Sequence, residues 1–145
     1  MSAVFHYPYT VASGDIDELG HANNLAYLRW LLEAAGAHSA ALGWPAERYR
    51  EEGSAWVVRA HAIKYLQSTL EGDQLVILTW IAEMKKFSSL RRYEIVRPND
   101  NVLLCTASTE WAYVDVNTGA LKRISDEVLE ALPVLPTASV HAHDR

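Results

Sequence analysis

Apolar positions that recur at steps of three and four over residues 24–42 predict the longest helix of the chain. These positions are Leu25, Leu28, Leu32, Ala35, Ser39 and Leu42. Asn23 or Asn24 can cap the helix start, because a side-chain oxygen there accepts from free N–H groups of the first turn. Gly43 and Pro45 favour its end. The opposite face is apolar as well, so we expect the helix to be buried nearly all round.

Five other segments have the alternation or the β-branched and aromatic content of strands. They span residues 4–13, 54–67, 74–85, 90–97 and 102–116. Short connections join the last four, which predicts an antiparallel meander, whereas Pro8 places the first at a sheet edge or a bulge. Ser125 and Asp126 cap a short helix that ends near Leu132. One sheet and one apolar helix make a two-layer α+β domain, with the antiparallel sheet wrapped around one long buried helix.

The length of 145 residues corresponds to one domain. We assign this domain to residues 1–135 and expect residues 136–145 to form a flexible C-terminal tail. The net charge of −5 argues against a nucleic-acid partner. We find no apolar run that approaches the roughly 20 residues of a membrane span, and no signal peptide at the N-terminus. Cys105 is the single cysteine, so no internal disulfide can form and we expect a cytoplasmic protein.

The loop from residue 14 to residue 24 carries the strongest chemical signal. Asp15, Asp17 and His21 lie within seven residues, immediately before the predicted helix. A helix N-terminus offers unpaired N–H donors and about half a positive charge, which stabilise the oxyanion formed when a thioester carbonyl is attacked. A carboxylate beside it can act as base or nucleophile, so the loop favours acyl transfer or hydrolysis. The same spacing also suits a simple Asx-turn with a helix cap, and that alternative stays open.

The stretch D-x-D-x-x-G-H-x-N-N-x-x-Y-L-x-W, from Asp15 to Trp30, resembles the signature of the hot-dog-fold acyl thioesterases. The nearest groups are the 4-hydroxybenzoyl-CoA thioesterases and the bacterial acyl-CoA and plant acyl-ACP thioesterases. The resemblance covers roughly residues 5–125 and implies an antiparallel sheet curled around one long helix. It implies hydrolysis of an acyl-CoA or acyl-ACP thioester to a free acid and a thiol. It also implies a homodimer or a tetramer of dimers, with sheets joined edge to edge and the site built from both subunits.

The resemblance assigns roles within this loop. Asp17 corresponds to the catalytic carboxylate, and Asn24 falls where the family uses a backbone N–H to polarise the thioester carbonyl. His21 corresponds to a histidine in the site of the plant enzymes, and Asn23 is expected to orient the loop. The bacterial enzymes often carry a histidine where Asn24 stands, and the plant enzymes an asparagine where Leu19 stands. This chain therefore lacks part of the arrangement that positions the water molecule in each of the two groups. No metal and no redox cofactor is implied.

One basic cluster stands out in this acidic chain, and it surrounds the connection between the third and fourth predicted strands. Its members are Lys85, Lys86, Arg91 and Arg92. They can hold the phosphates of coenzyme A, as the corresponding basic hairpin of the 4-hydroxybenzoyl-CoA group does. The alternative is a solvated hairpin whose charges discourage aggregation.

Two other functions stay open. The hot-dog fold also hosts enoyl hydratases and dehydratases, whose motif resembles D-x-N-P-x-H with acid and base five residues apart. Here Asp17 and His21 are four apart and Asp15 and His21 are six apart, and neither Asn nor Pro occupies its place. The third possibility is a non-catalytic protein that binds an acyl thioester. Retention of Asp17 and of the G-H-x-N-N loop argues against it.

Overall fold

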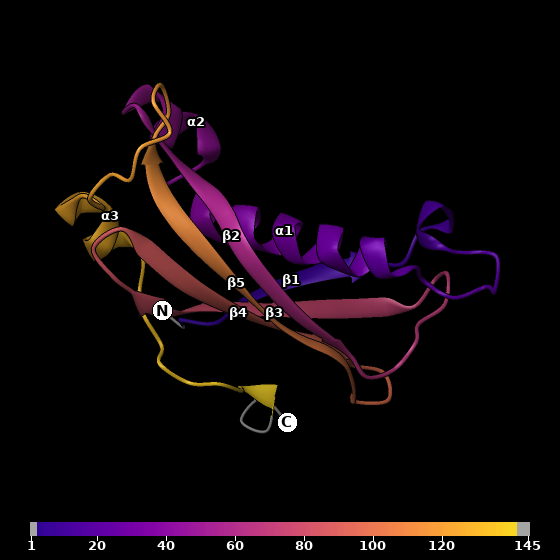
Figure 1. The fold of residues 1–145 in the computed structure, drawn as a ribbon. Helices are drawn as coiled ribbons and strands as arrows, with labels where there is room; N and C mark the ends of the chain where they lie inside the picture. Colours follow the sequence, from indigo (N-terminus) through magenta and orange to yellow (C-terminus); the bar gives the residue numbers. More distant parts are fainter. Residues whose placement is uncertain (1–2, 142–145) are drawn as a thin grey trace.

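The segments with strand character form one antiparallel sheet in the computed structural model, which describes residues 3–141 (Figure 1). The strands are β1 (Phe5–Thr10), β2 (Ser54–Tyr65), β3 (Gln74–Met84), β4 (Ser88–Arg97) and β5 (Val102–Asp115). Their order across the sheet is β1-β3-β4-β5-β2, so β1 and β2 form its two edges. The α+β class predicted from the sequence is confirmed.

The meander prediction holds for β3, β4 and β5, and it is wrong for β2. Strand β2 pairs with β5, whereas β3 pairs with β1 and β4. The segment 66–73 between β2 and β3 crosses the end of the sheet instead of turning tightly. Thr69 Oγ1 and the Leu70 N–H both donate to Asp73 Oδ2, at 2.7 and 3.0 Å, and fix its path. Strand β2 therefore lies at the edge beyond β5.

The long helix α1 (Asn24–Ala41) lies across one face of the sheet (Figure 1). Asn23 caps it, since its side chain accepts from the Ala26 N–H at 2.8 Å, and Gly43 follows its end with a φ of 92°. The face against the sheet contains Ala26, Tyr27, Trp30, Leu31, Ala34, Ala35 and His38. The expectation of burial all round is wrong, because Leu25 is 77% exposed and Leu28 and Leu32 are only half-buried. The aromatic and small side chains occupy the sheet side, which leaves the leucine ridge outward.

Two apolar clusters fill the space between helix and sheet. The larger one packs α1 on the inner side of the sheet, where Trp30 and Leu31 meet Ile77 and Ile95. The smaller one lies under the helices α2 (Ala46–Glu51) and α3 (Asp126–Ala131). The larger cluster runs along α1 from Ala26 to Ala35 and also contains Ala22, so the loop before the helix packs against it.

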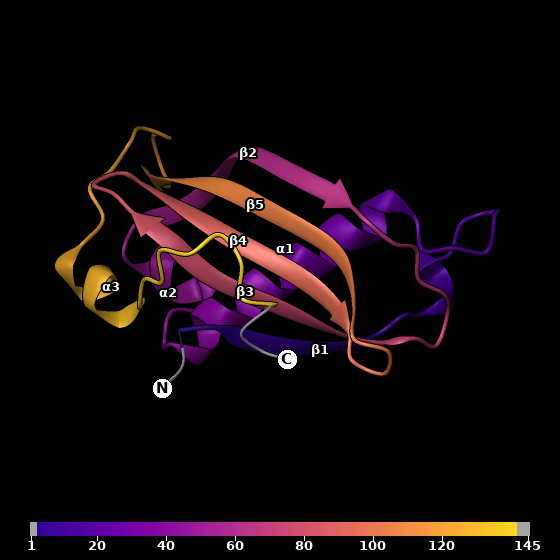
Figure 2. The same ribbon diagram turned by 90° about the horizontal axis from the view of Figure 1, so that it is seen from below.

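The last described residues lie on the outer face of the sheet, opposite α1 (Figure 2). Trp80 Nε1 donates to the Thr137 carbonyl at 3.0 Å. The buried Glu94 carboxylate accepts from Ser139 Oγ at 2.7 Å and from the N–H groups of Val140 and His141 at 3.0 and 2.7 Å. Segment 136–141, expected to be a flexible tail, thus has a defined place, and residues 142–145 lie outside the described part.

Candidate active site

Asp15 anchors the loop between β1 and α1. Its side chain is only 2% exposed and accepts from Tyr9 Oη at 2.7 Å, from the Ala12 N–H at 2.9 Å and from Arg29 Nη2. Its carbonyl oxygen accepts the N–H and the Nδ2 of Asn23, at 2.9 and 3.1 Å. One acid therefore ties the loop to the first strand and to the helix cap. Asn23 orients the loop as the sequence suggested.

Asp17 forms a tight turn with His21 at the tip of the loop. The Asp17 N–H donates to the His21 carbonyl at 2.8 Å, and Asp17 Oδ1 accepts from the N–H groups of Leu19 and His21 at 2.9 and 3.3 Å. Gly20 has a φ of 82°, which the turn requires. Asp17 is exposed, and within residues 3–141 its Oδ2 has no hydrogen-bond partner. The Asx-turn is real, and it leaves one carboxylate oxygen facing outward.

The first residue of α1 presents an unused donor beside this turn. The Asn24 carbonyl accepts from Tyr65 Oη at 3.2 Å, but its N–H donates to no group of the described chain. Asn23 satisfies the N–H of Ala26 instead. An unpaired N–H at a helix start, in the positive end of the helix dipole, is suited to an oxyanion. The structure therefore places Asp17, His21 and Asn24 on one exposed segment, in which the turn joins Asp17 to His21 and Asn24 follows three residues later.

The predicted basic cluster divides in the structure. Lys85 and Lys86 are exposed in the β3–β4 turn, where Lys85 Nζ lies 3.7 Å from Glu83 Oε1. Arg92 is half-buried, whereas Arg91 is 6% exposed and faces α1. Successive residues of a strand point to opposite faces, so Arg91 does not lie with the others on the surface. The structure therefore corrects the expectation that Arg91 contacts phosphate together with the other three basic residues.

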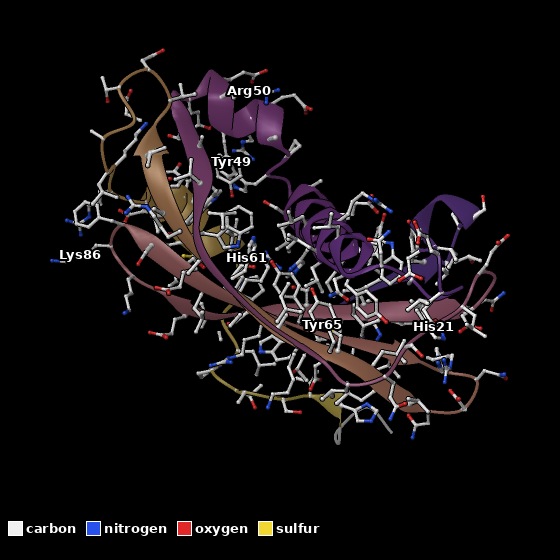
Figure 3. The ribbon with its side chains drawn as sticks, turned by 45° about the vertical axis from the view of Figure 1, so that its right-hand side comes forward. His21, Tyr49, Arg50, His61, Tyr65 and Lys86 are labelled. Atoms are coloured by element: carbon white, nitrogen blue, oxygen red, sulfur yellow. The ribbon has the colours of Figure 1, made fainter. Side chains whose placement is uncertain are left out.

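The Asp17 loop and the basic hairpin lie at opposite ends of the sheet. Figure 3 labels His21 at one end and Lys86 at the other. Tyr65, at the end of β2, lies on the His21 side, as its hydrogen bond to the Asn24 carbonyl requires. Within a single chain the two predicted parts of the site are therefore separated by the length of the sheet.

A buried polar pair beside a cavity was not predicted from the sequence. A cavity of about 350 Å³ lies between the C-terminal half of α1, α2 and the sheet, and Arg91 lines it. Arg91 Nη1 contacts His38 Nδ1 at 2.9 Å and Thr79 Oγ1 at 3.0 Å. Burial, with a contribution from the Arg91 charge, lowers the pKa of His38 to about 4. His38 is therefore neutral at pH 7 and accepts from the guanidinium. The pair could be found only once the fold was known, because the sequence does not show that Arg91 faces α1.

The part of the chain that the structure describes offers no alternative site built on a metal or a reactive thiol. Within residues 3–141, no three His, Cys, Asp or Glu side chains are grouped so that they could hold a metal ion. Cys105 is buried, and burial raises the pKa of its thiol to about 12. No helix in the described part of the chain has the length and apolar character needed to cross a bilayer.

The curled antiparallel sheet with one long helix on its inner face defines a hot-dog fold. The model of the thioesterase-like superfamily matches residues 11–132, and the chain belongs to this superfamily. That range includes the Asp17 loop, all of α1 and the basic hairpin. A comparison with curated proteins found no match.

Solved structures share the fold at low sequence identity. A 1,4-dihydroxy-2-naphthoyl-CoA thioesterase from Synechocystis aligns with a TM-score of 0.83 and 18% identity, covering 89% of this chain and 95% of that one. A DHNA-CoA thioesterase from Staphylococcus aureus gives 0.82 and 20%, covering 88% and 87%. A probable thioesterase, YbaW, from Escherichia coli gives 0.74 and 21%, covering 88% and 95%. These likenesses establish the fold and leave the substrate to be inferred.

Proposed function

We propose that the chain is a cytoplasmic thioesterase that hydrolyses an acyl thioester of coenzyme A or of acyl carrier protein. The observation that carries this proposal is the exposed Asp17 carboxylate, with its free Oδ2, in the loop that leads into the first turn of α1, where the Asn24 N–H has no partner within residues 3–141. A base or nucleophile next to an oxyanion donor is the minimum that acyl hydrolysis needs. Membership of the thioesterase-like superfamily supports a thioester as the substrate.

Two routes start from Asp17. As a general base, it takes a proton from water while the water oxygen attacks the carbonyl carbon. As a nucleophile, its free Oδ2 attacks the carbonyl carbon, and the C–S bond breaks to give an anhydride and a thiolate; water then hydrolyses the anhydride, and the thiolate takes a proton from solvent. In the general-base route the C–S bond breaks after the attack of water, and the thiolate takes the proton that Asp17 removed from that water. In both routes the carbonyl oxygen gains negative charge that the Asn24 N–H and the positive helix end stabilise. His21, on the same exposed turn, belongs to the site in this proposal.

Lys85 and Lys86 are the proposed contacts for the coenzyme A phosphates, and Arg92, further along β4, is a third candidate. Both lysines are exposed, and a carboxylate contacts only Lys85, at 3.7 Å. The described solved structures include two that are named as CoA thioesterases, which supports CoA as the carrier. Arg91 has no part in this contact, because it is buried on the inner face of the sheet.

We propose that two copies complete the site, as a homodimer or a tetramer of dimers. Strand β2 is a long free edge in the described sheet, and its Val57 and Val58 are 39% and 40% exposed. Such an edge favours pairing with another strand. Antiparallel pairing of β2 with its copy brings the Asp17 end of one chain toward the hairpin end of the other. Light scattering at micromolar concentration tests this: a multiple of 16.2 kDa is expected, and a monomer would contradict it.

Release of thiol from a panel of acyl-CoA and acyl-ACP substrates tests the activity itself. We expect hydrolysis of at least one acyl-CoA. The same panel with enoyl-CoA, followed by loss of the enoyl absorbance, tests hydration. Hydration without thiol release would favour the hydratase function, and binding with neither reaction would favour a non-catalytic acyl-thioester binder.

A further inference from the structure

The cavity beside α1 is apolar and aromatic, and its only charged residues are arginines. Trp44, Tyr49, Trp56 and Trp111 contribute to its wall, and Ser39, Ser54 and Ser89 add hydroxyls. Arg50 and Arg91 also line it, and no Asp or Glu does. The whole chain has a net charge of −5, whereas this cavity is lined by two cations and no acid. Its charge favours an anion.

Arg91 is a buried cation that lacks a counter-ion. It is 6% exposed, and within residues 3–141 it forms no ion pair with a carboxylate. Its two hydrogen bonds, to neutral His38 and to Thr79, both use Nη1. A buried charge is costly unless it is paired, and a guanidinium has five donors in a planar fork. Most of the binding capacity of Arg91 is therefore unused by the protein.

The unused donors of Arg91 border open space. In the described residues the only buried side-chain nitrogen or oxygen atoms without a partner are Nε1 of Trp30 and Nε1 of Trp111. Nε and Nη2 of Arg91 are not among these atoms, so they are not sealed into the core. The cavity is the open space that Arg91 lines. Trp111 Nε1, by contrast, is buried away from the open space, so the Trp111 side chain gives the cavity an aromatic wall and no donor.

We propose that this cavity receives an acyl group that ends in a carboxylate, with the Arg91 guanidinium as its anion-binding group. The inference rests on the proposed thioesterase function and names the class of acyl group. The Nε and Nη2 donors match the two oxygens of a carboxylate, whereas the aromatic wall suits an apolar body between carboxylate and thioester. A volume of about 350 Å³ is near the lower end for ligand pockets, which favours a short acyl group.

The cavity and the reacting carbonyl meet across two subunits. Within one chain, Gly36 on the cavity wall lies twelve residues beyond Asn24, or about 18 Å along α1. Ser54 and Trp56, at the start of β2, line the cavity, and Tyr65, at its end, holds the Asn24 carbonyl. Antiparallel pairing of β2 with its copy places the start of one strand beside the end of the other. The helix start of one subunit then faces the cavity of the other.

The test uses CoA thioethers, which cannot be hydrolysed, so that binding is measured apart from catalysis. At each chain length three thioethers are compared, which end in a methyl, a hydroxyl or a carboxylate group, and their affinity is measured by calorimetry. At one chain length or more, we expect the carboxylate form to bind about 10–100-fold more tightly than the methyl form, as for a hydrogen bond to a charged group. The hydroxyl form distinguishes a neutral acceptor from an anion and is expected between the two. Equal affinity of all three forms at every length would overturn the proposal.

Arg91→Met removes the guanidinium and is expected to reduce the carboxylate preference to less than twofold. Arg123→Met is the matched control, because Arg123 is exposed and does not line the cavity. It should keep the full preference. If Arg91→Met does not fold, Arg91→Lys takes its place, and loss of the planar fork should reduce the preference at least threefold. A carboxylate preference that stays unchanged in the folded Arg91 variant would overturn the proposal and leave Arg91 with the single role of tying α1 to the sheet.

Thiol release from the matching thioesters separates this inference from the proposed function. Hydrolysis with no carboxylate preference in the thioether series would overturn the carboxylate proposal and leave the thioesterase proposal standing. A carboxylate preference with no hydrolysis of any thioester would support the cavity as an anion site and overturn the thioesterase proposal.

Discussion

Replacement of Asp15 by Asn should destabilise the fold, although Asp15 is only two residues from the proposed catalytic acid. The Asp15 side chain is 2% exposed and accepts from Tyr9, Ala12 and Arg29. Asn can keep one oxygen toward Tyr9 and Ala12, but it then turns an amide N–H₂ toward the Arg29 guanidinium. The charge-assisted hydrogen bond is lost and two donors face each other.

The cost follows from these contacts. A hydrogen bond to a charged group contributes about 1.5–3 kcal/mol. Arg29 is 51% exposed and regains water when the pair breaks, which places the loss in the lower part of that range. We expect the free energy of unfolding of Asp15→Asn to fall by about 2 kcal/mol.

Urea unfolding followed by tryptophan fluorescence measures this difference. Asp17→Asn is the matched control, because Asp17 is exposed and its turn uses only Oδ1, which Asn retains. We expect Asp17→Asn to lie within about 0.5–1 kcal/mol of the wild type. An Asp15→Asn protein as stable as the wild type, or equal losses for both variants, would refute the assignment of Asp15 as the structural acid.

Three other predictions follow from buried or exposed charges. The pKa of His38 is about 4 in the fold and about 6.5 when unfolded, so the unfolded chain binds more protons between these values. The free energy of unfolding should fall by up to about 3 kcal/mol from pH 6.5 to pH 4, and by less in His38→Asn; parallel pH profiles would contradict this. Glu94→Gln removes the charge that holds segment 136–141, so limited proteolysis there should accelerate, and unchanged cleavage would count against that role. In Lys85→Ala/Lys86→Ala the KM for acyl-CoA should rise, and in the wild type it should rise with ionic strength. A KM that changes in neither test would show that the two lysines do not contact the CoA phosphates.

The sequence located α1 but not its buried face. Leu25, Leu28 and Leu32 repeat with helical period, and so do Ala26 and Trp30. Both faces are apolar, so periodicity cannot say which of them meets the sheet. The packing of Trp30 against inward strand residues settles the choice and leaves Leu25 exposed.

The site was predictable where its residues are local in sequence. The turn from Asp17 to His21 and the cap at Asn23 depend on neighbours, and the motif contains them. The distinction between Asp15 and Asp17 depends on the distant Tyr9 and on Arg29, so composition and spacing alone could not make it. Arg91 and Arg92 are a similar case, because they are neighbours in the sequence but point to opposite faces of the sheet.

The central claim is that Asp17 performs the chemistry, and kcat of Asp17→Asn on an acyl-CoA substrate tests it most directly. The substitution keeps the size and the turn acceptor while it removes charge, basicity and nucleophilicity. We predict that kcat falls by about 10²–10⁴-fold, the range for a positioned acid–base group, while KM changes little. Folded Asp15→Asn should lose less activity than Asp17→Asn. A folded Asp17→Asn enzyme that keeps most of its thioesterase activity, or equal kcat losses for the two variants, would contradict the account.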